Sequence, residues 1–411
     1  MAMNDQHDIF MPFKGLVAAS DFAAEIASPP YDVVNREEAK EVAAGNPNSF
    51  LRVSRAEIEF PDKVKPTDKD VYKRAEINFR KLIDSGFLIS DSIPSYYVLK
   101  LQVGKHSQIG LVSAASLSAY NSGSIKRHEF TRPDKENDRV DHMKALSAAT
   151  GPTLLVHRPV SELADYFKGI TNRHPIIDIE RPDGVRHTLW RVSDKESINE
   201  IRIHLKSVDV SYIADGHHRT AAANRVAEEF NIMDGRFLSV MFPSDQLMIL
   251  DYNRVVRDLG QYTKDQFLNK LNTDFSVVPL TKPQKPKKNK NFSLYIGGQW
   301  YNMELKPTYK SVGDFSQNLD VSLLTNLVLK PVLDIQDLRT DPRIDFVGGA
   351  RGLEGLEKFL DVNNWSAAFS LFPTSIDSLM RVADNGSVMP PKSTWFEPKL
   401  LDGLVSLFLD I

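Results

Sequence analysis

The sequence predicts a mixed α/β protein with two domains. Segments with strand-like and helix-like patterns alternate along most of the chain, which is typical of this class. The clearest example is Val210–Phe230, which reads as a short apolar strand, a tight turn at Asp215-Gly216 and a helix with one apolar face. The chain has 411 residues, 42% of them hydrophobic, so it is long enough for two domains and apolar enough for buried cores.

The N-terminal part is expected to hold short strands and two helices. Phe13–Ile26 predicts an opening strand with a short connection, and Ser49–Ser54 predicts a second strand. Asn35 is expected to cap a helix, because Glu38 occupies the position that completes a capping box. A second helix is expected over Val71–Gly86, with apolar residues on one face and a glycine at its end.

The middle of the chain predicts further strands around one long helix. Two strands are expected at Ser95–Val103 and Gln108–Ser116, joined by a short turn. A helix is expected from Pro133 to about Ala149, because proline suits a first helical turn. Thr153–His157 predicts a buried strand, and Val185–Val192 predicts one strand of a hairpin.

The C-terminal part predicts a second, smaller α/β domain over residues 256–411. Just before it, Phe237–Phe242 and Leu247–Tyr252 predict a hairpin. Lys282–Asn291 is rich in lysine and proline and is interpreted as a solvated hairpin loop. The remaining elements are a helix at Val321–Leu333, a strand at Ile344–Val347, a helix from Leu353, a strand at Ala367–Leu371 and a helix from Ile376 to about Ala383.

The composition excludes several classes of protein. There is no cysteine, so disulfides, thiolate nucleophiles and thiolate metal sites are impossible. The net charge is −3 and the basic residues are not massed in one segment, which makes nucleic acid an unlikely partner. The first residues lack a secretory signal, and the chain has no apolar run of about 18 residues. We therefore expect a soluble, cytoplasmic protein with no membrane partner; the oligomeric state is left open.

The turn Asp215–Arg219 is the strongest candidate site. A strand-to-helix turn presents free backbone N–H groups at the positive end of a helix dipole, which attracts anions such as phosphate. We expect Gly216, His217, His218 and Arg219 to hold phosphate oxygens. Asp215 or one of the histidines would handle a proton, and Asp215 is the candidate metal ligand. The alternative is structural: Asp215 caps the helix and the histidines bond to a neighbouring loop.

A second candidate is the segment from His128 to Lys135, in which charges of both signs alternate. Such a mixture suits a substrate that itself carries both signs. Arg132 could bind a carboxylate or phosphate with two parallel hydrogen bonds, and His128 is a further candidate for substrate contact. Glu129 or Asp134 could act as a general base or bind Mg²⁺ through oxygen. The alternative is an exposed helix start.

Two further stretches near the C-terminus offer polar groups. Gly348–Gly352 is a glycine-rich turn between a strand and a helix, but it lacks the Lys-Ser/Thr ending of a Walker loop. Lys392 and Ser393 follow two prolines and are candidates for substrate binding in a cleft between domains. Both stretches are equally compatible with tight structural connections.

The motif Asp215-Gly216-His217-His218-Arg219 resembles the signature of free serine kinases in the ParB/sulfiredoxin superfamily. Most of the chain also resembles a prokaryotic family catalogued as domain of unknown function 1015. The second resemblance rests on Ser28–Val34, His128–Lys135, Arg343–Gly349 and Pro390–Phe396. Together they imply a ParB/sulfiredoxin-like nucleotide-binding core over residues 1–255, with an inserted α/β segment at about 56–208.

The resemblance also implies a function, namely phosphoryl transfer between a nucleotide, ATP or ADP, and a small hydroxylated metabolite, with free L-serine as the first acceptor to test. Mg²⁺ would neutralise the phosphate charge. In the superfamily an early loop lies across the nucleotide pocket from the central turn, which makes Tyr31 a candidate for substrate binding and Asp32 a candidate base. Glu129 is the competing base. Two alternatives stay open: a phosphatase acting on phosphoserine or a similar monoester, and a ParB-like nucleotide-binding regulator without metabolic activity.

Overall fold

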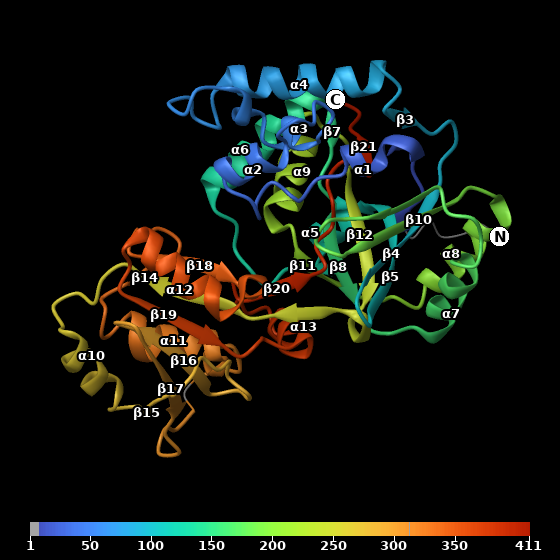
Figure 1. The fold of residues 1–411 in the computed structure, drawn as a ribbon. Coiled ribbons are helices and arrows are strands. Elements are labelled where there is room, and N and C mark those ends of the chain that lie inside the picture. The colour runs from blue at the N-terminus through green and yellow to red at the C-terminus, as the bar shows by residue number, and fades with distance from the viewer. Residues whose placement is uncertain (1–7, 312) are drawn as a thin grey trace. The chain divides into compact units, whose positions relative to one another are not determined.

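The structure is a computed structural model, and it describes residues 8–311 and 313–411. It confirms the mixed α/β class (Figure 1). The chain divides into two compact units. Unit 1 comprises the described residues up to Arg127, Thr131–Leu247 and Pro398–Ile411, and unit 2 comprises His128–Phe130 and Met248–Glu397. Unit 1 is therefore discontinuous in sequence, whereas the predicted division at 255/256 falls inside a strand of unit 2.

Unit 1 is built on a nine-stranded sheet with the order β6-β11-β8-β12-β5-β4-β10-β9, in which β1 also pairs with β5. A smaller sheet has the order β3-β2-β21-β7. The strands are β1 (Phe10–Met11), β2 (Gly15–Ala18), β3 (Leu88–Ser90), β4 (Tyr96–Val103), β5 (His106–Ser116), β6 (Ile125–Lys126), β7 (Ala148–Ala149), β8 (Thr153–His157), β9 (Ile177–Glu180), β10 (Arg186–Val192), β11 (Ser211–Asp215), β12 (Arg236–Pro243) and β21 (Val405–Phe408).

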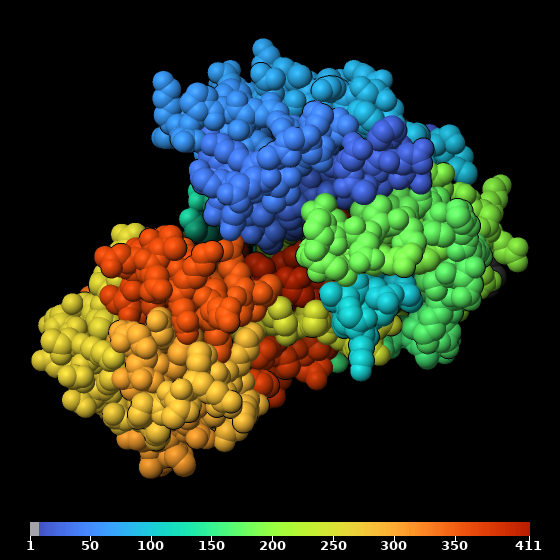
Figure 2. Space-filling view, in the orientation of Figure 1, coloured from blue at the N-terminus to red at the C-terminus, as the bar shows by residue number. Residues whose placement is uncertain are grey.

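The helices of unit 1 cover these sheets. They are α1 (Ala23–Ile26), α2 (Arg36–Val42), α3 (Leu51–Ser54), α4 (Lys69–Asp84), α5 (Leu117–Ser122), α6 (Pro133–Leu146), α7 (Ser161–Ile170), α8 (Lys195–Leu205) and α9 (His217–Glu229), with 3₁₀ turns η1 (Ser20–Phe22), η2 (Ala56–Glu59) and η3 (Ser244–Gln246). Helix α6 packs against both α4 and α9, and α9 packs on β12 and β8 (Figure 1). Residues of α4, light blue in Figure 2, lie at the surface of this unit.

Unit 2 contains a six-stranded antiparallel sheet with the order β15-β17-β16-β19-β14-β18, and a separate pair β13-β20. Its core gathers around Val255, Trp300, Val347, Leu356 and Leu360. The strands are β13 (Met248–Leu250), β14 (Tyr252–Val256), β15 (Phe275–Pro279), β16 (Asn291–Ile296), β17 (Gln299–Leu305), β18 (Ile344–Gly348), β19 (Ala367–Leu371) and β20 (Trp395–Glu397). The helices are α10 (Lys264–Leu271), α11 (Asp320–Leu324), α12 (Gly352–Asn363) and α13 (Ile376–Asp384), with η4 (Ser316–Asn318), the π-helix η5 (Thr325–Leu329) and η6 (Gly349–Arg351).

Most predicted elements are confirmed, but Ser49–Ser54 is not a strand. Residues Leu51–Ser54 form α3, and the amide of Ser54 donates to the carbonyl of Phe50. Phe50, Leu51 and Val53 are all buried. In a short run whose apolar residues are all buried, the hydrophobic periodicity does not distinguish a strand from a helix.

The predicted hairpin between Phe237–Phe242 and Leu247–Tyr252 is also wrong. Strand β12 lies in the interior of the large sheet, parallel to β8 on one side and antiparallel to β5 on the other. Both of its edges are occupied, so the following run cannot pair with it. That run divides into β13, which pairs with β20, and β14, which pairs with β18 and β19.

The lysine-rich segment is not a hairpin loop either, because β15 pairs with β17 and not with β16. The hairpin forms instead between β16 and β17 at Gly297-Gly298, where φ is 55° and 75°. Only glycine adopts two consecutive positive φ values at low cost, and this is the turn that joins twisted antiparallel strands. The helix predicted to end at Leu333 changes to a π-helix at Thr325, and the one predicted to reach Ala149 ends at Leu146.

The capping box of α2 is confirmed. The Asn35 side chain accepts from the Glu38 amide at 2.9 Å, and the Glu38 carboxylate accepts from the Asn35 amide at 2.9 Å. Replacing Asn35 with alanine is expected to lower the free energy of unfolding by about 0.5–2 kcal/mol, because a helix-end donor loses its partner. Urea denaturation of the variant checks this. Glu37→Ala, in the same exposed first turn but outside the box, is the matched control, and an equal loss in both variants would contradict the prediction.

Candidate phosphate site at the central turn

The central turn joins β11 to α9, as the sequence predicts. Gly216 has φ of 98°, a left-handed conformation that residues with a β carbon rarely adopt. A β carbon there would lie 3.1 Å from both Cα and Oγ1 of Thr153 and from Nε of Arg219. Conformation and close packing therefore both require glycine at this position. The turn leads directly into the N-terminal end of a 13-residue helix, where backbone amides and the dipole favour an anion.

Arg219 lies buried beside this turn, with 6% of its surface exposed. Its Nη1 donates to the carbonyl of Pro152, and its Nη2 lies 3.7 Å from Oδ1 of Asp215. Its Nε is also buried, and no group in the described part of the chain accepts a hydrogen bond from it. Burial opposes the charge, but Asp215 and Asp32 outweigh it and raise the pKa of the guanidinium above its ordinary value. The Arg219 guanidinium is therefore permanently charged.

Asp215 lies between two cations. Besides Arg219, the ammonium of Lys399 donates to its Oδ2 at 3.3 Å. A carboxylate held by two cations is less available to a metal ion, because the cations already neutralise its charge. The geometry favours a role in positioning Arg219, and the metal role of Asp215 stays a prediction.

Tyr31 and Asp32 are contributed by the proline turn that precedes α2, and the charge of Asp32 acts on Arg219. The side chain of Asp32 is exposed. Tyr31 stacks on Arg139, whose guanidinium lies 3.9 Å from the ring centroid. Burial, followed by the charge of Asp32, raises the pKa of Tyr31 to about 12, so its hydroxyl stays protonated. The predicted base and the predicted phosphate ligand thus belong to one electrostatic cluster in unit 1.

Two members of this cluster are absent from the sequence-based prediction. Arg139 on α6 is buried and forms an ion pair with Asp138, with Nη2 at 2.7 Å from Oδ2. Asp402 is 1% exposed and pairs through its backbone with Ser28. A charged residue inside the apolar run Leu400–Val405 is costly to bury without purpose, and this signal could have identified Asp402. Arg139 stands among the many charges of α6 and gives no such signal.

A cavity of about 110 Å³ adjoins the cluster in unit 1. Its lining combines charges of both signs with tyrosines and a histidine, and includes Tyr31, Arg55, Glu57, Tyr72, Asp138, Arg139 and His142. Burial, followed by the charge of Arg139, lowers the pKa of His142 to about 4, so this imidazole is neutral. Its Nε2 lies 3.0 Å from the carbonyl of Val53, which fixes the ring.

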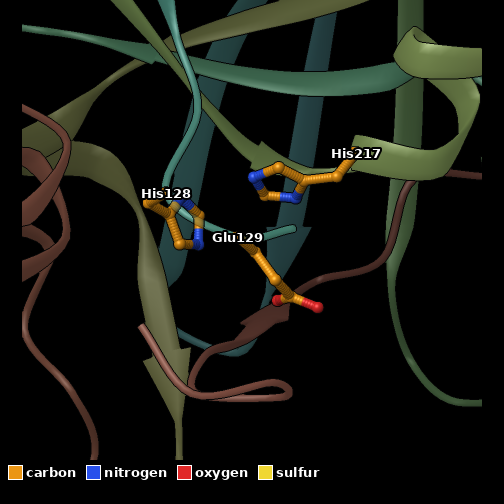
Figure 3. A group of neighbouring side chains, drawn as sticks. All are labelled: His128, Glu129 and His217. Carbon is orange, nitrogen blue, oxygen red and sulfur yellow. The ribbon is translucent and has the colours of Figure 1, made fainter. Parts of the chain in front are cut away.

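The histidines of the central turn have different neighbours. The Arg132 amide donates to Nε2 of His218 at 3.0 Å. His217 is buried at the start of α9 (Figure 3), whereas His128, which is buried, and Glu129, which is half-buried, are counted with unit 2. Side chains of consecutive helical residues point about 100° apart, so the two adjacent histidines face different surroundings.

Arg132 is exposed, and its guanidinium binds Asp134 through Nε at 3.3 Å and Nη2 at 3.1 Å. A bidentate substrate would have to displace this carboxylate. Lys392 and Ser393 belong to unit 2. Ser393 is buried and donates to the Pro390 carbonyl at 2.6 Å, while the Lys392 carbonyl accepts from Arg254. The Ser393 hydroxyl is thus used within its own loop.

The glycine turn of unit 2 is a close-packed connection. A β carbon on Gly348 would lie 2.5 Å from the Trp395 ring, and one on Gly349 would lie 2.5 Å from the Asp251 carboxylate. These contacts explain both glycines without a ligand. Across the described residues, no helix is long and apolar enough to cross a membrane.

Comparison with known proteins identifies a family and several solved structures. The model of the family described as "Protein of unknown function (DUF1015)" matches residues 10–322. No curated protein matches the chain. A mutant of a free serine kinase in complex with AMP is similar to it at 14% identity and a TM-score of 0.38, covering 69% of this chain and 86% of that one.

Two further solved structures match the chain with similar identities, coverages and TM-scores. A conserved hypothetical protein from Pyrococcus furiosus has 15% identity and a TM-score of 0.38, with coverage of 71% of this chain and 93% of that chain. C-terminally truncated SbnI from Staphylococcus aureus has 10% identity and a TM-score of 0.37, with coverage of 71% and 85%.

Proposed function

The chain belongs to the DUF1015 family, whose description assigns no function, and we propose from the geometry of unit 1 that this protein transfers a phosphoryl group between a nucleotide and a small hydroxylated metabolite. The observation that carries the proposal is Arg219, a buried cation placed at the start of α9 beside a glycine turn. A helix N-terminus together with a fixed guanidinium is suited to the phosphates of a nucleotide such as ATP or ADP.

Asp32 supplies the base in this proposal. It is exposed on a rigid turn, and its charge acts on the same cluster as Arg219. A carboxylate in this position can take the proton of the acceptor hydroxyl while the phosphate is held at the turn. Bound Mg²⁺ would neutralise phosphate charge, and the Asp32 carboxylate is an oxygen ligand of the kind that this ion prefers. Catalysis then consists of positioning and electrostatic stabilisation.

We place the acceptor in the small cavity beside Tyr31. The lining of the cavity includes two ion pairs, Arg55 with Glu57 at 2.7 Å and Arg139 with Asp138 at 2.7 Å. This mixture suits a small molecule that carries both signs of charge. Free L-serine, which the Asp215–Arg219 motif suggests by resemblance, is such a molecule and is the first acceptor to test.

The test is a binding screen followed by a transfer assay. The purified protein is titrated with ADP, ATP and CTP in the presence of Mg²⁺ and monitored by thermal unfolding. A ligand that binds only the folded state, at about 100 times its dissociation constant, stabilises it by about 2.7 kcal/mol. Nucleotide binding followed by formation of phosphoserine from serine would support the proposal. Hydrolysis of phosphoserine without a nucleotide, or no stabilisation by any nucleotide, would contradict it.

A further inference from the structure

Asp402 is a buried carboxyl group beside the central turn that no step of the proposed reaction uses. It lies shortly before β21 in the sequence. Its amide donates to the Ser28 carbonyl at 3.0 Å, and its carbonyl accepts from the Ser28 amide at 3.1 Å. Those bonds are made by the backbone and do not involve the carboxyl group. Its Oδ1 is buried, and no group in the described residues donates a hydrogen bond to it.

Arg219 and Asp402 approach the same point from two directions. A β carbon on Gly151 would lie 3.0 Å from Oδ1 of Asp402, 3.2 Å from Cδ of Arg219 and 3.5 Å from Nη1 of Arg219. The two side chains therefore border one small space, which Gly151 keeps open by lacking a side chain. Nε of Arg219 lacks a hydrogen-bond acceptor in the described structure as well.

The charged groups around Asp402 come from three elements. Arg219 on α9 and Arg139 on α6 favour its ionised form, while Asp32 on the proline turn disfavours it. The amide of Tyr31 also donates a hydrogen bond to it. Burial is the largest influence, and with Asp32 it raises the pKa of Asp402 to about 7. The group therefore changes charge near neutrality, next to the cation that we assign to phosphate.

We propose that Asp402 is a positioning residue that competes with phosphate for Arg219, so that binding of an anion at the central turn is coupled to uptake of one proton by Asp402. When Asp402 is ionised, it attracts Arg219 and repels an anion. When a phosphate binds, its charge favours the neutral form of Asp402, so the carboxylate takes up a proton from solvent and no longer holds Arg219 away from the ligand. This inference rests on the proposed phosphate role of the turn.

The test compares the wild type with Asp402→Asn, which keeps the shape of the side chain but stays neutral at every pH. Inorganic sulfate is the first probe, because it is a tetrahedral anion that does not titrate near neutrality, and Mg²⁺–ADP is the second. Dissociation constants are measured between pH 5.5 and 8.5. Asp320→Asn in unit 2 is the matched control, since burial also raises the pKa of Asp320, to about 6.

We expect wild-type affinity for sulfate to fall about fivefold relative to Asp402→Asn as the pH rises from 6 to 8, the change that follows when a bound anion raises the pKa of this carboxyl by about 1. The Asp320→Asn control should show the same pH dependence of sulfate affinity as the wild type. Parallel pH profiles for wild type and Asp402→Asn would overturn the inference, as would failure of sulfate to bind. If the pH profiles of sulfate binding differ between wild type and Asp402→Asn but ADP does not bind, the coupling of Asp402 to an anion site is supported and the proposed phosphoryl transfer is contradicted.

Discussion

Replacing Asp32 with asparagine is expected to lower turnover by about 10²–10⁴-fold, the usual contribution of a positioned general base. The amide keeps the size of the side chain but cannot accept the proton of the acceptor hydroxyl. Affinity for the nucleotide should be nearly unchanged, because Arg219 and the start of α9 remain intact. A single-turnover assay with saturating nucleotide, alongside a binding titration, separates the two effects.

Asp21→Asn is the matched control, because it removes an exposed carboxylate from the same unit without touching the cluster. Glu129→Gln is measured in parallel, since Glu129 is the competing candidate base. A loss of turnover in Glu129→Gln with normal turnover in Asp32→Asn would assign the base to Glu129. Equal losses of nucleotide affinity and turnover in Asp32→Asn would show that Asp32 acts in binding instead.

Replacing Arg219 with alanine is expected to weaken nucleotide binding by about 10- to 150-fold, since a hydrogen bond to a charged group contributes about 1.5–3 kcal/mol. The variant should also be less stable, because Asp215 loses its buried partner. Thermal unfolding of the free protein therefore accompanies the titration. Arg219→Lys keeps the charge without the planar fork and is expected to retain part of the affinity.

The control for this experiment is Arg225→Ala. Arg225 lies on the same helix, where it is exposed and forms an ion pair with Glu136 at 2.9 Å. Loss of an exposed pair costs little, so nucleotide affinity should not change. Unaltered affinity in a folded Arg219→Ala protein would remove the main support for the proposed function.

The central turn could be predicted from sequence because its signals are local. The apolar run before Asp215, the glycine and the helical period after it are all contained in Val210–Phe230. The capping box at Asn35 is equally local, and it is confirmed. By contrast, whether Ser49–Ser54 forms a strand or a helix depends on tertiary burial that the sequence alone does not display.

Strand pairing and the membership of the cluster depend on distant parts of the chain. The position of β12 between β8 and β5 removes the predicted hairpin, and no property of residues 237–252 reveals this. Asp402 lies near the turn because its backbone pairs with that of Ser28, a residue at the opposite end of the sequence. Arg139 belongs to the cluster because α6, which carries it, packs against α9. Neither residue stands in a recognisable motif, so only the fold brings them to Arg219.

The discontinuity of unit 1 has a consequence for the order of events during synthesis. All of unit 2 from Met248 to Glu397 is translated before Pro398–Ile411, the segment that supplies Lys399, Asp402 and the interior strand β21. Because domains generally fold as units while the chain emerges from the ribosome, unit 2 can fold while unit 1 still lacks this strand. A nascent chain stalled before residue 398 would therefore carry the central turn without Lys399 and Asp402, two of the charged residues around it.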